Sequence, residues 1–190
     1  MRSTILLALL ALPFTAPLAG GPTPEALAFT CAGCHGTDGS SVGPSSPSIA
    51  GMDPDVFIDA MLDYKKDHRN PTIMNRIAKG YSDEQIRGMA LFFFKQPLRT
   101  QSQDVDPTLV ALGKSLHDAH CEKCHELGGK AGDAGTLAGQ WMPYLDFAMS
   151  DFIAGHRAWP RKMKRKVDAA IAEQGPQALP ALIHYYGSQH

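Results

Sequence analysis

A five-residue motif, Cys-x-x-Cys-His, occurs twice in this chain and limits what the chain can fold around. It reads CAGCH at residues 31–35 and CEKCH at residues 121–125. Thiols three residues apart lie on one side of a helical turn, and the histidine four residues after the first thiol lies there too. Two such thiols can form thioether bonds to a porphyrin while the imidazole binds its iron. The repeated motif therefore predicts two covalently bound haem c groups.

The two motifs account for all four cysteines of the chain. A thioredoxin-like redox pair would need a strand–helix–strand context, which is missing, and zinc binding is the remaining structural alternative. The predicted thioether cysteines are Cys31, Cys34, Cys121 and Cys124, and the predicted proximal iron ligands are His35 and His125.

Residues 1–20 are typical of a secretory signal peptide that is removed, with one basic residue, an apolar stretch from Ile5 to Leu12 and small residues near the end. The apolar stretch is too short to span a bilayer, so we expect no membrane span after its removal. Export to the periplasm agrees with the cysteines, because haem attachment of this type belongs to an oxidising compartment. The formal net charge of -1 does not indicate nucleic acid as a partner.

The residues that follow the motifs repeat as well. GMDPDVFIDAMLDY from Gly51 aligns without gaps on GQWMPYLDFAMSDF from Gly139, and both end in Ala-Met-x-Asp-aromatic. This internal repeat indicates two related domains in tandem. Neither half shows the alternating pattern of strands, so we expect an all-α fold. The predicted boundaries are residues 21–97 for the first domain, 98–107 for a polar linker and 108–190 for the second domain.

Local signals place helices in both halves. Thr23-Pro24-Glu25 is typical of a helix start, and Ser82-Asp83-Glu84-Gln85 is a capping box for a helix with an apolar face. In the second half we expect a helix that leads into CEKCH, a helix from Pro143 and a final helix. The basic run RAWPRKMKRK at residues 157–166 is predicted to be a loop before the final helix. This run is either a solvated surface, a group of charges that neutralises haem propionates, or a docking site for an acidic partner.

The ligand on the far side of each iron decides between electron transfer and catalysis, and methionine there closes the iron to substrates. Met74 lies 39 residues after His35, in a stretch that we expect to be a loop, and Met163 lies 38 residues after His125. We therefore predict Met74 and Met163 as the distal ligands.

Other methionines and histidines give weaker candidates. Met61 and its repeat partner Met149 have helical spacing among apolar residues, which favours core packing. His68 and His156 also align in the repeat, so ligation of each iron by two histidines is an alternative. The two histidines at positions 117 and 120 are predicted to be surface residues of the helix that enters CEKCH.

The loop after His35 is rich in glycine, serine and proline. Such a loop can offer a backbone carbonyl, that of Pro44 for example, to the second nitrogen of the proximal imidazole and so fix its orientation. A solvated connector without this role is the alternative. The corresponding second loop, ELGGKAGDAGT, has no proline to mirror Pro44, so the same contact is in doubt for His125.

Four segments, CAGCHGTDGSSVGPSSPSIAGMDP, TIMNRIAKGYSDEQI, CEKCH and LAGQWMPYLDFAMSDF, resemble the dihaem cytochrome subunit of flavocytochrome c sulfide dehydrogenase. The likeness covers essentially the whole mature chain. It implies two tandem cytochrome c domains in a periplasmic heterodimer, with an FAD-containing flavoprotein subunit that oxidises sulfide. This chain, without catalytic residues of its own, would pass the electrons to a soluble acceptor cytochrome. By motif, the axial pairs are His35 with Met74 and His125 with Met163.

Two other functions are compatible with the motifs. A free dihaem carrier that serves a terminal oxidase or reductase needs the same iron ligands but no flavoprotein partner. A dihaem peroxidase would need one iron open to peroxide, so that Met163 would not bind its iron.

Overall fold

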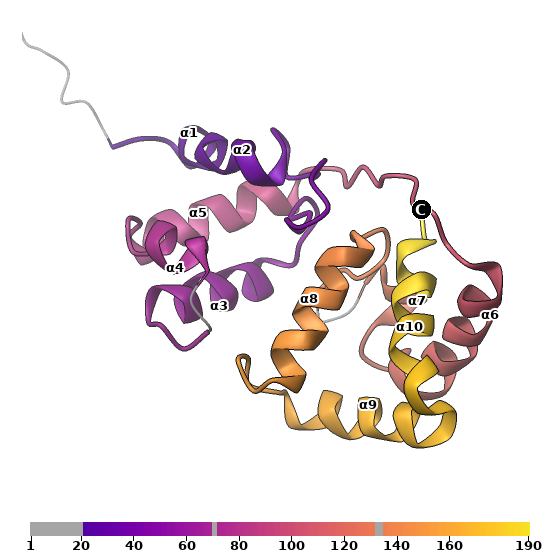
Figure 1. The fold of residues 1–190 in the computed structure, drawn as a ribbon. Helices are drawn as coiled ribbons and strands as arrows, with labels where there is room; N and C mark the ends of the chain where they lie inside the picture. The colour runs from indigo at the N-terminus through magenta and orange to yellow at the C-terminus, as the bar shows by residue number, and fades with distance from the viewer. Residues whose placement is uncertain (1–20, 70–71, 132–134) are drawn as a thin grey trace, which may run out of the picture.

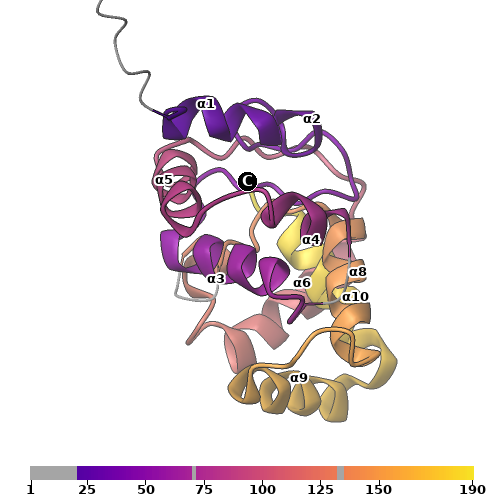
Figure 2. The ribbon, with the colours of Figure 1, turned by 90° about the vertical axis from the view of Figure 1, so that its left-hand side faces the viewer.

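The computed structural model describes residues 21–69, 72–131 and 135–190, and the predicted signal peptide lies outside these ranges. All regular elements in the described residues are helices or helical turns, which confirms the all-α prediction. Figures 1 and 2 show two groups of helices, one from each half of the chain. The helices of the first half are α1 (Pro24–Ala28), α2 (Ala32–His35), α3 (Pro54–Lys65), α4 (Ile73–Ala78) and α5 (Asp83–Phe94). Those of the second are α6 (Pro107–Leu116), α7 (Glu126–Gly129), α8 (Met142–Ile153), α9 (Arg161–Gln174) and α10 (Ala178–Gly187).

The helices of the first half begin where the local signals predict. The Thr23 hydroxyl accepts a hydrogen bond from the Ala26 amide at 3.2 Å, at the start of α1. The capping box at α5 is confirmed in both directions, because Ser82 and Gln85 each accept a hydrogen bond from the other's backbone amide. These contacts satisfy amide groups that have no partner inside a helix.

The first core lies where α1 and α3 pack against α5, with α4 packed against α3. The predicted apolar face of α5 is confirmed, because Ile86, Met89, Ala90 and Phe93 are fully buried. Met61 of α3 is buried in the same core, as its helical spacing predicts. This core supports the helical turn that carries CAGCH.

The second core is built on the crossing of α6 and α10, with α8 and α9 packed around it. Gly113 allows the two helices to approach closely. A Cβ atom at this position would lie 2.0 Å from the backbone oxygen of Ala181 in α10. The corresponding crossing in the first core is that of α1 and α5. It also contains a glycine, Gly88 of α5, where an added Cβ would lie 2.9 Å from Pro24 of α1.

The predicted basic loop is wrong, because α9 begins at Arg161 and takes in most of that run. The helix continues through the charged residues since its other face buries Val167 and Ala170. Lys164 and Asp168, one turn apart on the exposed face, form an ion pair at 2.8 Å. Among the described residues, no helix has the length and the apolar character needed to cross a membrane.

The two halves touch through a buried pair of hydrogen bonds. Between the halves, residues 97–106 form no helix. The Gln140 side chain accepts a hydrogen bond from the Ser48 amide at 3.0 Å and donates one to the Ser48 carbonyl at 2.7 Å. The Trp141 indole donates to the Ser41 carbonyl at 3.0 Å. The second half thus holds the loop that follows the first motif.

Candidate haem sites

The first motif lies on a helical turn that packs against the first core. A 3₁₀ turn, Phe29–Cys31, leads into α2, which ends at His35. Cys31 is half-buried against the core and Cys34 is exposed, and neither forms a disulfide. Burial raises the pKa of the Cys31 thiol. The turn therefore presents two free thiols and one imidazole together, as the spacing predicts.

The proximal imidazole of the first motif is fixed by a backbone carbonyl. Nδ1 of His35 lies 2.8 Å from the carbonyl oxygen of Pro47. Because a carbonyl can only accept, Nδ1 carries the proton and Nε2 keeps its lone pair, the form that binds a metal. Among the described residues Nε2 has no hydrogen bond, and burial lowers the pKa of His35, which keeps the ring neutral.

The predicted contact between a carbonyl of this loop and the second nitrogen of His35 is confirmed. The carbonyl is that of Pro47, so the choice of Pro44 is wrong. The loop folds back on itself, with the Ile49 amide bonded to the Gly39 carbonyl at 2.7 Å. The Ser41 amide donates to the Ser48 hydroxyl at 3.0 Å. These closures bring Pro47 under the imidazole.

The second motif has the same plan, with a different environment for the imidazole. Cys121 is half-buried, Cys124 is exposed, and both are free thiols. Burial lowers the pKa of His125, and the carbonyl of Gly135, which aligns with Pro47 in the repeat, opposes this shift. Nδ1 of His125 nevertheless has no partner at hydrogen-bonding geometry among the described residues. The carbonyl contact that His35 makes with Pro47 is thus not repeated at His125 by the described residues.

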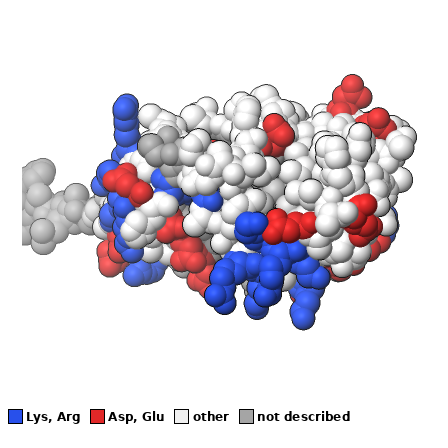
Figure 3. All heavy atoms as spheres, turned by 60° about the horizontal axis from the view of Figure 1, so that its bottom comes forward, with Lys and Arg blue, Asp and Glu red and all other residues white. Residues whose placement is uncertain are grey.

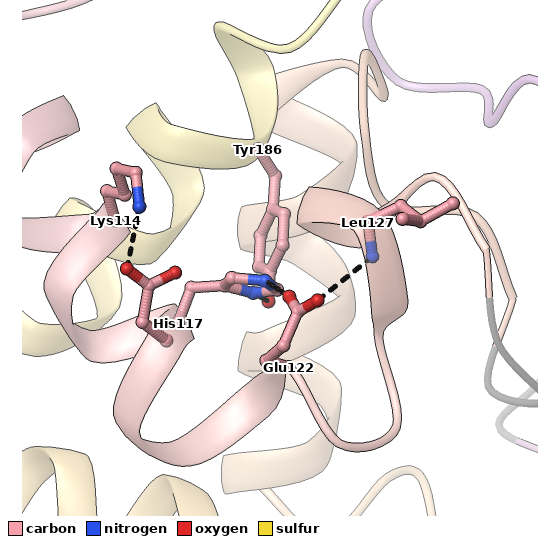
Figure 4. Close-up of polar contacts among 6 residues, drawn as sticks. Lys114, His117, Glu122, Leu127 and Tyr186 are labelled. Atoms are coloured by element: carbon pink, nitrogen blue, oxygen red, sulfur yellow. Dashed lines mark hydrogen bonds and ion pairs between the residues drawn. The ribbon is translucent and has the colours of Figure 1, made fainter.

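A polar cluster unique to the second half holds the turn that carries CEKCH (Figure 4). His117 is fully buried, so its predicted surface position is wrong. Its Nε2 donates to the Glu122 carboxylate, and its Nδ1 lies 3.0 Å from the Tyr186 hydroxyl. The other Glu122 oxygen accepts from the Leu127 amide at 3.1 Å. The cluster thereby ties α6, the motif and α10 together.

The repeat register contains the signal that would have placed His117 correctly. The cysteines and histidines of the motifs are 90 residues apart, and the same offset aligns His117 with Leu27. Leu27 lies in the first core, so its counterpart is expected to be buried. His120 is better described as a surface residue, since it is partly exposed and lies 2.8 Å from Glu173.

The predicted distal ligands lie at matching places. Met74 is the second residue of α4 and Met163 the third residue of α9. Both are half-buried in the first turn of a helix and not in a loop. The preceding Asn70-Pro71 lies outside the described residues. The axial pairs His35–Met74 and His125–Met163 stay predictions.

The alternative histidine ligands lie on the surface beside carboxylates. Nδ1 of His68 is 3.8 Å from Asp63, and Nδ1 of His156 is 3.7 Å from Asp151. These two contacts are equivalent in the repeat. Among the described residues, no three His, Cys, Asp or Glu side chains are grouped to hold a bare metal ion.

The residues of both sites fit a covalent haem. Each motif offers one thiol against a core and one at the surface, so that a porphyrin edge could be held between them. An imidazole with an unbonded Nε2 stands beside the thiols of the first motif. Exposed apolar side chains lie near by in the sequence, such as Phe29 before Cys31 and Ile73 before Met74. A porphyrin buries apolar surface of this kind.

Comparisons with known proteins agree with these motifs, although no protein-family model matches the chain. Over 69 residues, 36% of this chain, it is 46% identical to the cytochrome subunit of sulfide dehydrogenase of Chlorobaculum tepidum. The aligned part is 62% of that protein, so the chain spans less than two thirds of its length. Over 70 residues, 35% of this chain, it is 33% identical to cytochrome c-554(548) of Halomonas halodenitrificans, covering 84% of that protein.

Longer matches cover both halves of the chain. It is 29% identical over 172 residues to cytochrome c4 of Pseudomonas aeruginosa, which is 84% of this chain and 85% of that protein. The crystal structure of reduced recombinant cytochrome c4 from Pseudomonas stutzeri superposes with a TM-score of 0.75 at 24% identity. That match covers 88% of this chain and 97% of the other. The predicted fold of two tandem cytochrome c domains is confirmed.

Proposed function

Because the chain belongs to the cytochrome c family, we propose that it is a periplasmic electron-transfer protein that holds two haem c groups. The observation that carries the proposal is the first proximal site, where two free thiols accompany an imidazole held through Nδ1 with Nε2 open. The second motif repeats the two free thiols and the imidazole 90 residues later, without a hydrogen bond to Nδ1 of His125 among the described residues. The haem would supply a one-electron iron couple, and the chain itself needs no catalytic residue. We assign residues 1–20 to the signal peptide, 21–97 and 108–190 to the two domains and 98–107 to the linker.

We infer that Met74 and Met163 complete the iron coordination. Their support is the common position in the first turn of a helix and their near-equal spacing from the two histidines. A thioether there closes the iron to substrates and reduces rearrangement during electron transfer. The polypeptide then serves to orient two imidazoles, exclude water from the rings and hold the domains together.

For the electron donor we propose an FAD flavoprotein that oxidises sulfide and forms a heterodimer with this chain. The support is the 46% identity to a protein named as the cytochrome subunit of sulfide dehydrogenase. Two electrons would leave the donor and pass one at a time through this chain to a soluble acceptor cytochrome. A free dihaem carrier is the second candidate, favoured by the cytochrome c4 relatives that match along most of the chain.

The haem assignment is tested by a haemochrome assay and by matched methionine variants. Two haems per chain are expected. Met74→Leu and Met163→Leu should each abolish the methionine-to-iron absorption of one haem, whereas Met61→Leu, a buried core position, should retain both. An unchanged spectrum in Met163→Leu would favour the peroxidase alternative, and a zinc-containing product without haem would refute the proposal.

The two donor hypotheses are separated by purification from the native source. A flavoprotein with bound FAD should co-purify with this chain, and sulfide should then reduce its haems within the complex. A chain that purifies alone and is reduced by no added flavoprotein in the presence of sulfide is the free carrier.

A further inference from the structure

Five exposed basic side chains in the first half of α9, which we call the α9 patch, form a dense positive surface. They are Arg161, Lys162, Lys164, Arg165 and Lys166. Figure 3 turns the bottom of Figure 1, and with it α9, toward the viewer and shows these side chains gathered together. Of these five side chains, only Lys164 has a carboxylate of a described residue within 4.0 Å, that of Asp168. The patch is therefore largely uncompensated in a chain whose formal net charge is -1.

The position of the patch works against the stability of its own helix. The N-terminal end of a helix carries partial positive charge and favours acidic residues. The first turn of α9 contains none, and its first two residues are Arg161 and Lys162. Since this placement does not stabilise the helix, a requirement at the surface is the better explanation for it.

The patch adjoins the second haem site. Helix α9 packs against residues His117–Cys121, and the end of α9 opposite the patch is fixed there by Glu173, which lies 2.8 Å from His120. Burial raises the pKa of Cys121, and the nearby positive charge of Lys166 opposes this shift. Met163, the proposed iron ligand, lies between two lysines of the patch. A partner bound to the patch would thus lie beside the second haem.

The duplicated plan does not account for the patch. The helix of the first domain that carries the corresponding methionine is α4, and it contains a single basic residue, Arg76. Ile73 and Ile77 are exposed on the same helix. The corresponding helix of the first domain thus lacks this positive surface.

We propose that the α9 patch is the docking surface for an acidic redox protein that takes electrons from the second haem. This rests on the proposed function, because it requires haem at CEKCH. In each encounter the ferrous iron gives up one electron and becomes ferric, and the metal centre of the acceptor gains that electron. An acidic protein fits better than an anionic membrane, because α9 buries Val167 and Ala170 and leaves Ile171, 38% exposed and outside the patch, as its exposed large apolar side chain for insertion into lipid.

The test measures electron transfer from the fully reduced protein to an oxidised acidic plastocyanin, a blue-copper protein that serves as the probe. The triple variant Lys162→Gln, Arg165→Gln, Lys166→Gln removes three charges from the patch. The control, Lys66→Gln, Arg87→Gln, Lys95→Gln, removes three exposed charges of the first domain that form no ion pair with another described residue. Both variants have the same net charge, so a difference between them reports on location.

At low ionic strength the second-order rate constant should fall at least about tenfold in the patch variant and less than about threefold in the control. Salt should slow the wild type and hardly affect the patch variant. Equal losses in the two variants would overturn the proposal. Patch-dependent binding to phosphatidylglycerol vesicles without an effect on plastocyanin would overturn it in favour of a membrane surface.

Haem content keeps this test separate from the proposed function. A wild-type chain with fewer than two haems contradicts the function, whereas two reducible haems with a patch-independent rate contradict only the docking surface. If the triple variant loses the methionine-to-iron absorption, the single variants Lys162→Gln and Lys166→Gln decide. Each should lower the rate constant about twofold or more, and no change in either would overturn the proposal.

Discussion

Replacing His117 by Leu and Tyr186 by Phe, singly and together, will measure the hydrogen bond that links the second haem turn to α10. The double variant gives the second domain the residues of the first. Leu27 corresponds to His117 in the repeat, and Phe93 corresponds to Tyr186, since their carbonyls accept hydrogen bonds from the equivalent residues Gly51 and Gly139. The first core shows that the apolar pair packs well in this fold.

The expected magnitude follows from burial. His117 is fully buried and Tyr186 is 6% exposed, so either single change leaves a polar atom without a partner. A stranded group of this kind costs about 1–3 kcal/mol, whereas removal of both partners is nearly neutral. We expect a coupling energy of about 1–2 kcal/mol. The contact to Glu122 adds little to this, because its side chain is 46% exposed and regains water.

Guanidinium unfolding of the haem-containing protein, followed by tryptophan fluorescence, reports on the second domain because Trp141 and Trp159 both lie there. Tyr185→Phe is the matched control. Its ring lies 5.1 Å from the His117 ring without a hydrogen bond to it among the described contacts. Its coupling to the His117 change should stay below about 0.5 kcal/mol. Equal coupling for the two tyrosines would refute the hydrogen-bond argument.

Three further changes have defined outcomes. Gly113→Ala should lower the free energy of unfolding by about 3 kcal/mol, because the added Cβ meets the backbone of α10. Gly88→Ala, whose Cβ meets only the ring of Pro24, should lower it by about 1 kcal/mol in the same guanidinium titration. The reverse order would contradict the geometry of the two helix crossings. The hydrogen bond from His117 holds the pKa of Glu122 below its usual 4.5, so its stabilisation is present above that pH and is lost as the pH falls further. Glu122→Gln should therefore flatten the decline in melting temperature between pH 5 and pH 3, and parallel curves would count against the pair. Gln140→Met, which leaves two buried backbone groups unpaired, should lower the free energy of unfolding by about 2 kcal/mol, and an unchanged midpoint would exclude this contribution.

The features that sequence reasoning predicted correctly depend on residues near one another in the chain. The thiols and histidine of CAGCH lie on one turn by their spacing alone. The Ser82 capping box and the apolar face of α5 follow from local hydrogen bonding and helical periodicity. These signals need no knowledge of the rest of the molecule.

The features that were missed depend on distant contacts. Lys164 and its neighbours have the composition of a loop, but burial of Val167 against the second core outweighs that local preference. The choice of Pro47 over Pro44 is decided by how the loop closes on Gly39. His117 is buried because Tyr186, 69 residues further along the chain, supplies its partner.

The contact of Gln140 with Ser48 means that the two cytochrome c domains are not interchangeable modules. Ser48 follows Pro47, the residue whose carbonyl orients His35, so a side chain of the second domain braces the proximal ligand of the first. A first domain produced alone would lose this brace and expose the Ser48 backbone to water. Its iron would then have a more freely rotating imidazole, and its reduction potential would differ from that in the intact chain. Division at the linker would thus yield a different electron carrier instead of half of this one.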